Sequence, residues 1–265
     1  RFGSHELKKQ FLVPTIAGDF VACLGISEAG AGSDVSLLSW NVHSHLQTFL
    51  SENIVHVHGA SIFCELSHTL FSSGIHVAKK IDKLGMRSSD TAQIFFEDVR
   101  VPCKNLIGEE GKGFTYQMLQ FQEERLWGVA TVLTPMETII GETVDYTRQR
   151  KVFGQPVLHN QTVHFRLAEL ATEVELLRSL LHRAVALYVE GNDVTKFASM
   201  AKLKAGRLTR EVTDSCLQFW GGMGFTSEVL VSRFYRDLRL MSIGGGTDET
   251  MLSIICKYMD ILPRK

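Results

Sequence analysis

The hydrophobic pattern divides the chain into two parts with different periods. Up to about residue 105, apolar and polar residues alternate along short runs that glycine-rich turns interrupt. Alternation of this kind is typical of half-buried β-strands, and it predicts strands at 53–59, 75–80 and 93–101. Pro102 follows the last of these runs. Because a proline cannot donate to a β-ladder, we expect it to end that strand.

The second part, from Gly113 onward, has the period of α-helices. One stripe of apolar residues at helical spacing consists of Leu167, Leu170, Val174, Leu177 and Leu181. Similar spacing predicts a helix that starts at Gly113 and another that runs from about Thr195 toward Phe219. A last helix is expected from Thr247 to about Met259.

The ends of these segments carry residues that suit helix termini. Gly191 follows the leucine stripe as a stop signal, Thr195 could N-cap the next helix, and the acidic residues at 248–249 favour a helix start. Long helices joined by short loops indicate an antiparallel bundle. The expected fold class is therefore α+β, with a small β domain over residues 1–108 and a C-terminal helical bundle over 109–265.

Composition excludes some classes of function. Lys and Arg together number 28 against 29 Asp and Glu, so no basic surface for nucleic acid or for a membrane is expected. No run of apolar residues is long enough for a membrane span. The expected partner is a small molecule or another subunit.

Cysteines and histidines give no metal or disulfide pattern. The five cysteines are scattered and never occur as Cys-x-x-Cys, which favours free thiols in a reducing compartment. His43 with His45, and His56 with His58, could each lie on one face of a strand. No cysteine or carboxylate joins them at ligand spacing, so no metal site is predicted.

The stretch from Gly25 to Asp34, Gly-Ile-Ser-Glu-Ala-Gly-Ala-Gly-Ser-Asp, carries candidate binding chemistry. Its glycines would let the backbone approach a ligand closely, and Ser27 and Ser33 offer hydroxyl groups. It lacks the Lys-Ser/Thr of a P-loop and the following helix of a dinucleotide-binding turn. The alternative is an ordinary glycine-rich turn between strands.

This stretch is the first of several segments that follow one another in a specific order. The others are 83–91, 96–102, 106–114, 148–154, Gln161, 218–225, 236–239 and 244–249. Together they resemble the middle and C-terminal domains of the acyl-CoA dehydrogenases over nearly the whole chain. The resemblance implies FAD as cofactor and α,β-dehydrogenation of an acyl-CoA thioester. It also implies an acceptor of the electron-transfer-flavoprotein type, a homodimer or homotetramer, and a place in the mitochondrial matrix.

The resemblance also assigns cofactor contacts. Arg150 and Phe153 would meet the adenosine-pyrophosphate end of FAD on a neighbouring subunit, because the rigid fork of arginine matches phosphate oxygens. A solvated helix end is the alternative for Arg150, and a helix C-cap is a compatible one for Gly221 and Gly222. The implied cofactor contacts are Leu24, Ser27, Gly32, Ser33, Arg150, Phe153, Gln161, Gln218, Gly221, Gly222, Thr247 and Glu249.

The resemblance suggests which carboxylate acts as the base. Many members carry a glutamate directly before the Gly-Thr of the last motif, where this chain has Gly245. A second family pattern, of the long-chain and isovaleryl type, places the base on the first long helix before Arg-Leu. Glu124 occupies that position here. The alternative is that Glu124 is a surface carboxylate, as Glu123 is expected to be. The implied acyl-CoA contacts are Ser33, Gln122, Arg125 and Gly246.

Two departures from the family pattern leave other readings open. The chain begins at Arg1, after the family's N-terminal helical domain, which suggests a fragment, a processed chain or an isoform. Residues 60–74 are too few for the strands that the family has there, and Glu65 and Leu66 stand where a hydroxyl and an asparagine are expected. The alternatives are an impaired isoform that oligomerises but binds flavin poorly, and an oxidase that passes electrons to oxygen.

Overall fold

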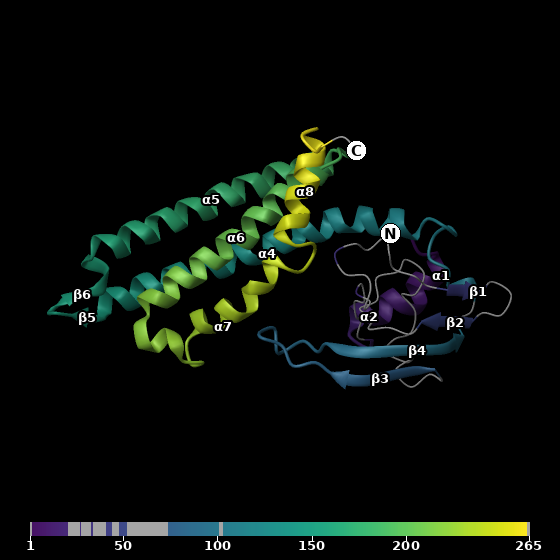
Figure 1. Cartoon of the computed structure of the whole chain (residues 1–265), viewed down its shortest axis with the longest axis horizontal. Helices are drawn as coiled ribbons and strands as arrows, with labels where there is room; N and C mark the ends of the chain where they lie inside the picture. The colour runs from purple at the N-terminus through teal and green to yellow at the C-terminus, as the bar shows by residue number, and fades with distance from the viewer. Residues whose placement is uncertain are drawn as a thin grey trace. The chain divides into compact units, whose positions relative to one another are not determined.

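A computed structural model of the chain (Figure 1) describes residues 2–20, 27, 33, 41–43, 48–51, 74–100 and 103–263. The chain splits into two compact units. Unit 1 is Arg1–Lys83 with Arg87–Gln120, and unit 2 is Leu84–Met86 with Phe121–Lys265. The helix α4 contributes its first turns to unit 1 and the rest to unit 2. The domain boundary near residue 108 stays a prediction.

In the part of unit 1 that the structure describes, four antiparallel strands form a sheet with the order β1-β2-β4-β3. Its strands are β1 (Asn41–His43), β2 (Thr48–Ser51), β3 (Ile75–Lys80) and β4 (Ala92–Arg100). Ile75, Phe96 and Val99 are buried. The strand predicted at 75–80 is confirmed as β3. The strand predicted at 93–101 corresponds to β4, which begins and ends one residue earlier. The predicted strand at 53–59 and Pro102 lie outside the described residues.

Short helices come before the sheet and after it. They are α1 (His5–Leu7), the π-helix η1 (Lys8–Leu12), α2 (Val13–Ala17) and the 3-10 turn η3 (Cys103–Asn105). Ser4 caps α1, because its side chain accepts the N–H of Leu7 at 3.2 Å. Gly18 ends α2 with φ 87°, a conformation that favours glycine.

Unit 2 is a helical bundle. Its helices are α4 (Gly113–Gln149), α5 (Gln161–Val189), α6 (Thr195–Phe219), α7 (Leu230–Asp237) and α8 (Asp248–Tyr258). Shorter elements join them: β5 (Lys151–Val152), β6 (Gln155–Pro156), η4 (Val157–His159), η5 (Gly221–Phe225) and η6 (Leu238–Ser242). Figure 1 shows α4, α5 and α6 side by side with alternating direction, as the predicted antiparallel bundle requires. None of the described helices is long and apolar enough to cross a membrane.

The core of unit 2 is formed by facing stripes of α4, α5 and α6. The predicted stripe on α5, from Leu167 to Leu181, is at most 5% exposed at each of its leucine and valine positions. Several of the facing residues on α6 are small, and Ala198, Ala201 and Ala205 are fully buried. Small residues on this face let the neighbouring elements approach α6 closely.

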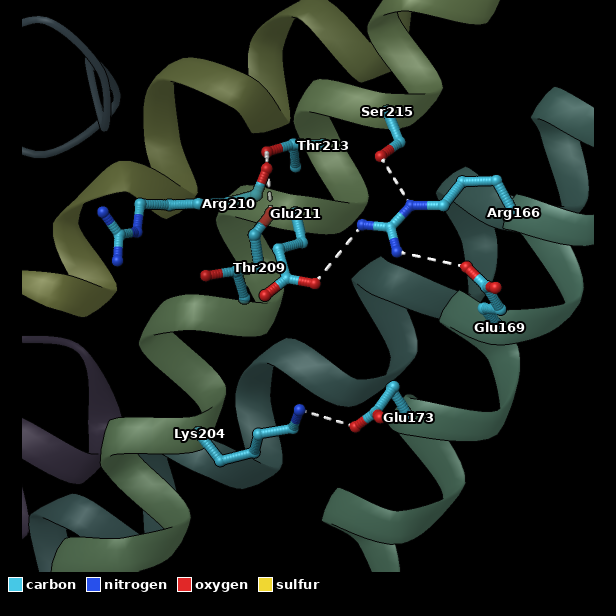
Figure 2. A network of polar contacts seen from close by, with 9 residues as sticks. All are labelled: Arg166, Glu169, Glu173, Lys204, Thr209, Arg210, Glu211, Thr213 and Ser215. Atoms are coloured by element: carbon cyan, nitrogen blue, oxygen red, sulfur yellow. Dashed lines mark hydrogen bonds and ion pairs between the residues drawn. The ribbon is translucent and has the colours of Figure 1, made fainter. Parts of the chain in front are cut away.

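Polar contacts on the surface join α5 to α6 (Figure 2). Arg166 contacts Glu211 at 3.3 Å and Ser215 at 3.2 Å. Lys204 pairs with Glu173 at 2.5 Å. Solvent-exposed pairs contribute little to stability, so the packing of the core holds the two helices together.

The helix ends agree with the sequence except at Thr195. Gly191 follows α5 with φ 86°, and Thr247 caps α8 by accepting the N–H of Thr250 at 3.2 Å. The prediction that Thr195 caps α6 is wrong, because Thr195 is the first helical residue. The Oδ1 atom of Asp193 accepts its N–H at 2.9 Å and its hydroxyl at 2.6 Å. A carboxylate two residues earlier is the stronger acceptor for this helix end.

Candidate active site

The residues just before Glu124 on α4 are tied to other helices of unit 2. The amide of Gln122 donates to Oδ1 of Asp193 at 3.3 Å, and Asp193 also accepts the hydroxyl of Tyr258 at 2.8 Å. The hydroxyl of Tyr188 on α5 donates to Oε1 of Glu123. The expectation that Glu123 is an ordinary surface carboxylate is therefore wrong. It is half-buried and holds a tyrosine of the neighbouring helix.

Arg125 connects α4 to the glycine turn before α8. Its side chain is 9% exposed, its guanidinium lies 5.7 Å from the ring centre of Phe121, and its Nε donates to the carbonyl oxygen of Gly245 at 3.4 Å. Burial lowers the pKa of Arg125, and the negative charge of Glu124 partly offsets this effect. Arginine nevertheless keeps its charge in proteins. A fixed positive charge thus lies beside the half-buried carboxylate of Glu124.

The turn between η6 and α8 has a backbone that favours glycine. Gly245 and Gly246 have φ 67° and 98°, values that residues with a side chain rarely adopt. A Cβ on Gly246 would also lie 2.6 Å from Cε of the buried Met251. Arg125 directly follows Glu124 and contacts the Gly245 carbonyl, so the two positions at which the resemblance expects a base lie in the same region of the bundle.

Sequence reasoning missed Lys202. This lysine of α6 is 2% exposed, and its Nζ donates to the carbonyl oxygen of Gly246. Burial lowers the pKa of Lys202 to about 8, and nearby charges, among them Asp248 and Arg125, act on it with opposite signs. The available signal was its spacing, because position 202 falls on the same stripe as Ala198 and Ala205.

The start of α8 is negatively charged and is matched by arginines of α6. The carboxylate of Asp248 is 7% exposed and lies 3.1 Å from Arg210 and 3.9 Å from Arg207. Glu249 is exposed, and its pKa is lowered by hydrogen bonds from its own backbone N–H and from Thr247. N–H groups at a helix N-terminus suit anionic or polar groups, and the cofactor contacts expected of Thr247 and Glu249 stay a prediction.

The hairpin β5–β6 presents a cation and an aromatic ring. Arg150 is exposed at the end of α4, and Phe153 is 102% exposed at the tip of the hairpin. Phe153 and Gly154 both have positive φ, 52° and 81°, as a two-residue hairpin turn requires. A bulky residue held in this conformation at the surface stores strain, which occurs preferentially where a residue contacts a ligand or partner.

The same end of the bundle carries four more of the predicted cofactor contacts. Gln161, Gln218, Gly221 and Gly222 are exposed there. Gly221 follows α6 with φ 58°, so the helix-end reading holds, and a Cβ at either glycine would meet nothing within 4 Å. Trp220 fixes this end, because its ring stacks on Tyr146 at 4.1 Å. An exposed cation, an exposed ring, two amides and an open glycine turn suit a ligand with phosphates and a flat base.

The predicted cofactor contacts of unit 2 form two separate groups. One lies at the hairpin end, and the other, with Thr247 and Glu249, lies by the glycine turn near Arg125. Along α4 alone, Arg125 and Gln149 are about 36 Å apart at the rise of an α-helix. A single chain therefore does not bring the two groups into one site.

The β domain is only partly described at its predicted contacts. Ser27 is half-buried and Ser33 is exposed. Leu24, Gly32, residues 60–73 and His45, His56 and His58 lie outside the described residues. Within the part of the chain that the structure describes, no group of three or more His, Cys, Asp or Glu could hold a metal ion.

Comparisons with known proteins agree with these features. The family model for "Acyl-CoA dehydrogenase, C-terminal domain" matches residues 111–259. The long-chain specific acyl-CoA dehydrogenase of Rattus norvegicus mitochondria is 34% identical over 97% of this chain and 65% of its own length. The short-chain specific acyl-CoA dehydrogenase of Megasphaera elsdenii is 31% identical over 96% of this chain and 72% of its own length.

Solved structures give the same result. The crystal structure of acyl-CoA dehydrogenase from Geobacillus kaustophilus has a TM-score of 0.89 at 30% identity and covers 98% of this chain and 74% of that chain. The chain spans 65% of the length of the rat relative. The resemblance drawn from the ordered motifs and the α+β fold class are therefore confirmed.

Proposed function

The chain belongs to the acyl-CoA dehydrogenase family, and we propose on this premise that it acts in the FAD-dependent α,β-dehydrogenation of acyl-CoA thioesters. The observation that carries the proposal is the position of Glu124. It directly precedes Arg125, whose Nε contacts the carbonyl of Gly245. We therefore propose that the carboxylate on α4 lies near the late turn, which is the other position at which the resemblance expects the base.

In the proposed reaction, Glu124 removes the α-proton of the acyl thioester. The buried guanidinium of Arg125 places a fixed positive charge beside this carboxylate. The neighbours of Glu124 are held by contacts to Tyr188, Asp193 and Gly245. These contacts fix the α4 turn that presents the carboxylate, and a general base must be fixed within hydrogen-bond reach of the proton.

FAD is the proposed cofactor, and it would accept the β-hydride of the substrate. The hairpin end of unit 2 supports this assignment. Arg150 and Phe153 are exposed there, and the turn at Gly221–Gly222 has no side chain to exclude a ligand. These groups fit the adenosine-pyrophosphate end of FAD. Thr247 and Glu249 lie by the glycine turn at the start of α8, away from the hairpin. They are proposed to contact the FAD molecule that is bound at that end of the bundle.

A homodimer or homotetramer is part of the proposal. The two groups of cofactor contacts are separated along α4 by about 36 Å, so one FAD molecule would take its contacts from two copies of the chain. We also propose an acceptor of the electron-transfer-flavoprotein type and a place in the mitochondrial matrix. The second point is supported by the mitochondrial relative from rat, while a bacterial relative has similar identity.

The proposal is tested by the visible spectrum and the products of the purified chain supplied with FAD. We expect a yellow protein that converts saturated acyl-CoAs to trans-2-enoyl-CoAs when a dye accepts the electrons. Hydrogen peroxide formed in proportion to product would instead indicate an oxidase. A colourless protein that forms a defined oligomer without turnover would contradict the proposed activity and indicate the impaired isoform.

A further inference from the structure

Lys202 is a charged residue in the core of unit 2. Only 2% of its surface is exposed, and Ala198, Ala201 and Ala205 lie beside it on the buried face of α6. Taking an ammonium group out of water is costly unless protein groups replace the lost hydrogen bonds. A lysine at this position therefore needs a polar partner inside the bundle.

The partner is the turn before α8. Nζ of Lys202 donates to the carbonyl oxygen of Gly246, and Nε of Arg125 donates to that of Gly245 at 3.4 Å. Two cationic side chains from two helices thus hold two consecutive carbonyl groups. Hydrogen bonds from charged donors are stronger than those between neutral groups. The placement of the turn therefore depends on both side chains.

The backbone of α6 is also close to the residues on each side of the turn. A Cβ at Gly206 would lie 2.9 Å from the carbonyl of Met241, 2.9 Å from Oγ of Ser242 and 3.0 Å from Oδ1 of Asp248. Gly206 and Lys202 are four residues apart, so they share one face of the helix. Gly206 lets the ends of the turn approach α6, and Lys202 holds its middle.

We propose that Lys202 is a positioning residue that, together with Arg125, holds the Gly245–Gly246 turn in place for the acyl thioester. The part of this proposal that concerns the thioester rests on the proposed function. Lys202 acts through the backbone of the turn, without contact to the substrate.

The positioning is tested by amide hydrogen exchange on Lys202→Met, which keeps the length of the side chain and removes its donors. The matched control is Lys204→Met, on the same helix, because Lys204 pairs with Glu173 on the surface (Figure 2). We expect faster exchange over residues 243–251 in Lys202→Met and the parent rate in Lys204→Met. Parent rates in both variants would overturn the proposal.

The consequence for the substrate is tested by acyl-CoA binding to the same proteins loaded with FAD. In Lys202→Met we expect the dissociation constant for acyl-CoA to rise about tenfold, because one hydrogen bond from a charged donor is lost. The FAD content should not change. Faster exchange with an unchanged dissociation constant would overturn the role toward the thioester. If the parent itself binds no acyl-CoA, the proposed function fails, and the exchange rates still decide whether Lys202 holds the turn.

Folding of the variant is the remaining control. Lys202→Gln, shorter and uncharged, is measured in the same way where Lys202→Met does not fold. If neither variant folds under conditions in which Lys204→Met does, Lys202 belongs to the stability of the core, and the proposal is overturned.

Discussion

Alanine at Gly206 and at Gly141 should change stability in opposite directions. Both glycines lie inside long helices, Gly206 in α6 and Gly141 in α4. Alanine is favoured over glycine in a helix by about 1 kcal/mol. A Cβ at Gly141 meets nothing within 4 Å, whereas one at Gly206 comes within 3.0 Å of the Met241 carbonyl, Ser242 and Asp248. We therefore expect Gly141→Ala to raise the free energy of unfolding by about 1 kcal/mol.

For Gly206→Ala the same gain is outweighed by overpacking, which costs about 1–3 kcal/mol in a dense core and about 2–3 kcal/mol where the neighbours are held in place. The neighbours cannot move away easily, because one is a backbone carbonyl and Asp248 is held at 3.1 Å by Arg210. The net loss should be about 1–2 kcal/mol. With a urea m-value of about 2 kcal/mol per molar, it lowers the midpoint by roughly 0.5–1 M. Far-ultraviolet circular dichroism, which reports the helices, measures this shift. Equal stabilisation by both substitutions would refute the close approach of η6 and α8 to α6.

Three further outcomes are expected. Leu170, in the core of unit 2, is 0% exposed, so Leu170→Ala should lower the free energy of unfolding by about 3–5 kcal/mol in a denaturant titration. Leu176 on the same helix is 58% exposed, and Leu176→Ala should change that free energy by no more than about 0.5 kcal/mol. Similar losses in the two variants would contradict the buried stripe of α5. Phe153→Gly should relieve about 1 kcal/mol of backbone strain and so raise the midpoint of denaturant unfolding. The same variant should bind FAD more weakly in a fluorescence titration. An unchanged affinity for FAD would show that Phe153 is not part of the cofactor site. The third outcome concerns pH. Burial lowers the pKa of Lys202 from 10.5 to about 8, so the unfolded chain holds this proton more tightly and stability should rise with pH between these values. The free energy of unfolding should rise by at most about 1.4 kcal/mol per pH unit. If Lys202→Met shows the same rise, another titrating group causes it.

Much of the bundle could be predicted because its signals are local. The leucines of α5 recur at the spacing of one helix face, and the same residues are buried. Gly191 ends α5 through its own backbone conformation, and Thr247 caps α8 through the N–H of Thr250, three residues away. The prediction for Thr195 failed because the carboxylate of Asp193, two residues earlier, is the stronger acceptor.

The site could be predicted only in part. Glu124 and Arg125 stand in a short motif, so sequence resemblance can propose them as site residues. The contacts of Lys202 with Gly246 and of Tyr188 with Glu123 join residues far apart in the chain. Spacing within one helix reveals that Lys202 faces the core, but it cannot reveal which turn supplies the partner. Such contacts depend on how the helices pack against one another.

The central claim is that Glu124 is the base of an acyl-CoA dehydrogenase. It is tested most directly by anaerobic reduction of the bound flavin by acyl-CoA in the parent, in Glu124→Gln and in Glu123→Gln. Glutamine at 123 still accepts the hydroxyl of Tyr188, so this variant is a matched control. We expect the visible flavin band to bleach in the parent and in Glu123→Gln. In Glu124→Gln it should bleach at least about a hundredfold more slowly, the loss expected for a general base, with FAD still bound. Bleaching at the parent rate in Glu124→Gln would contradict the account.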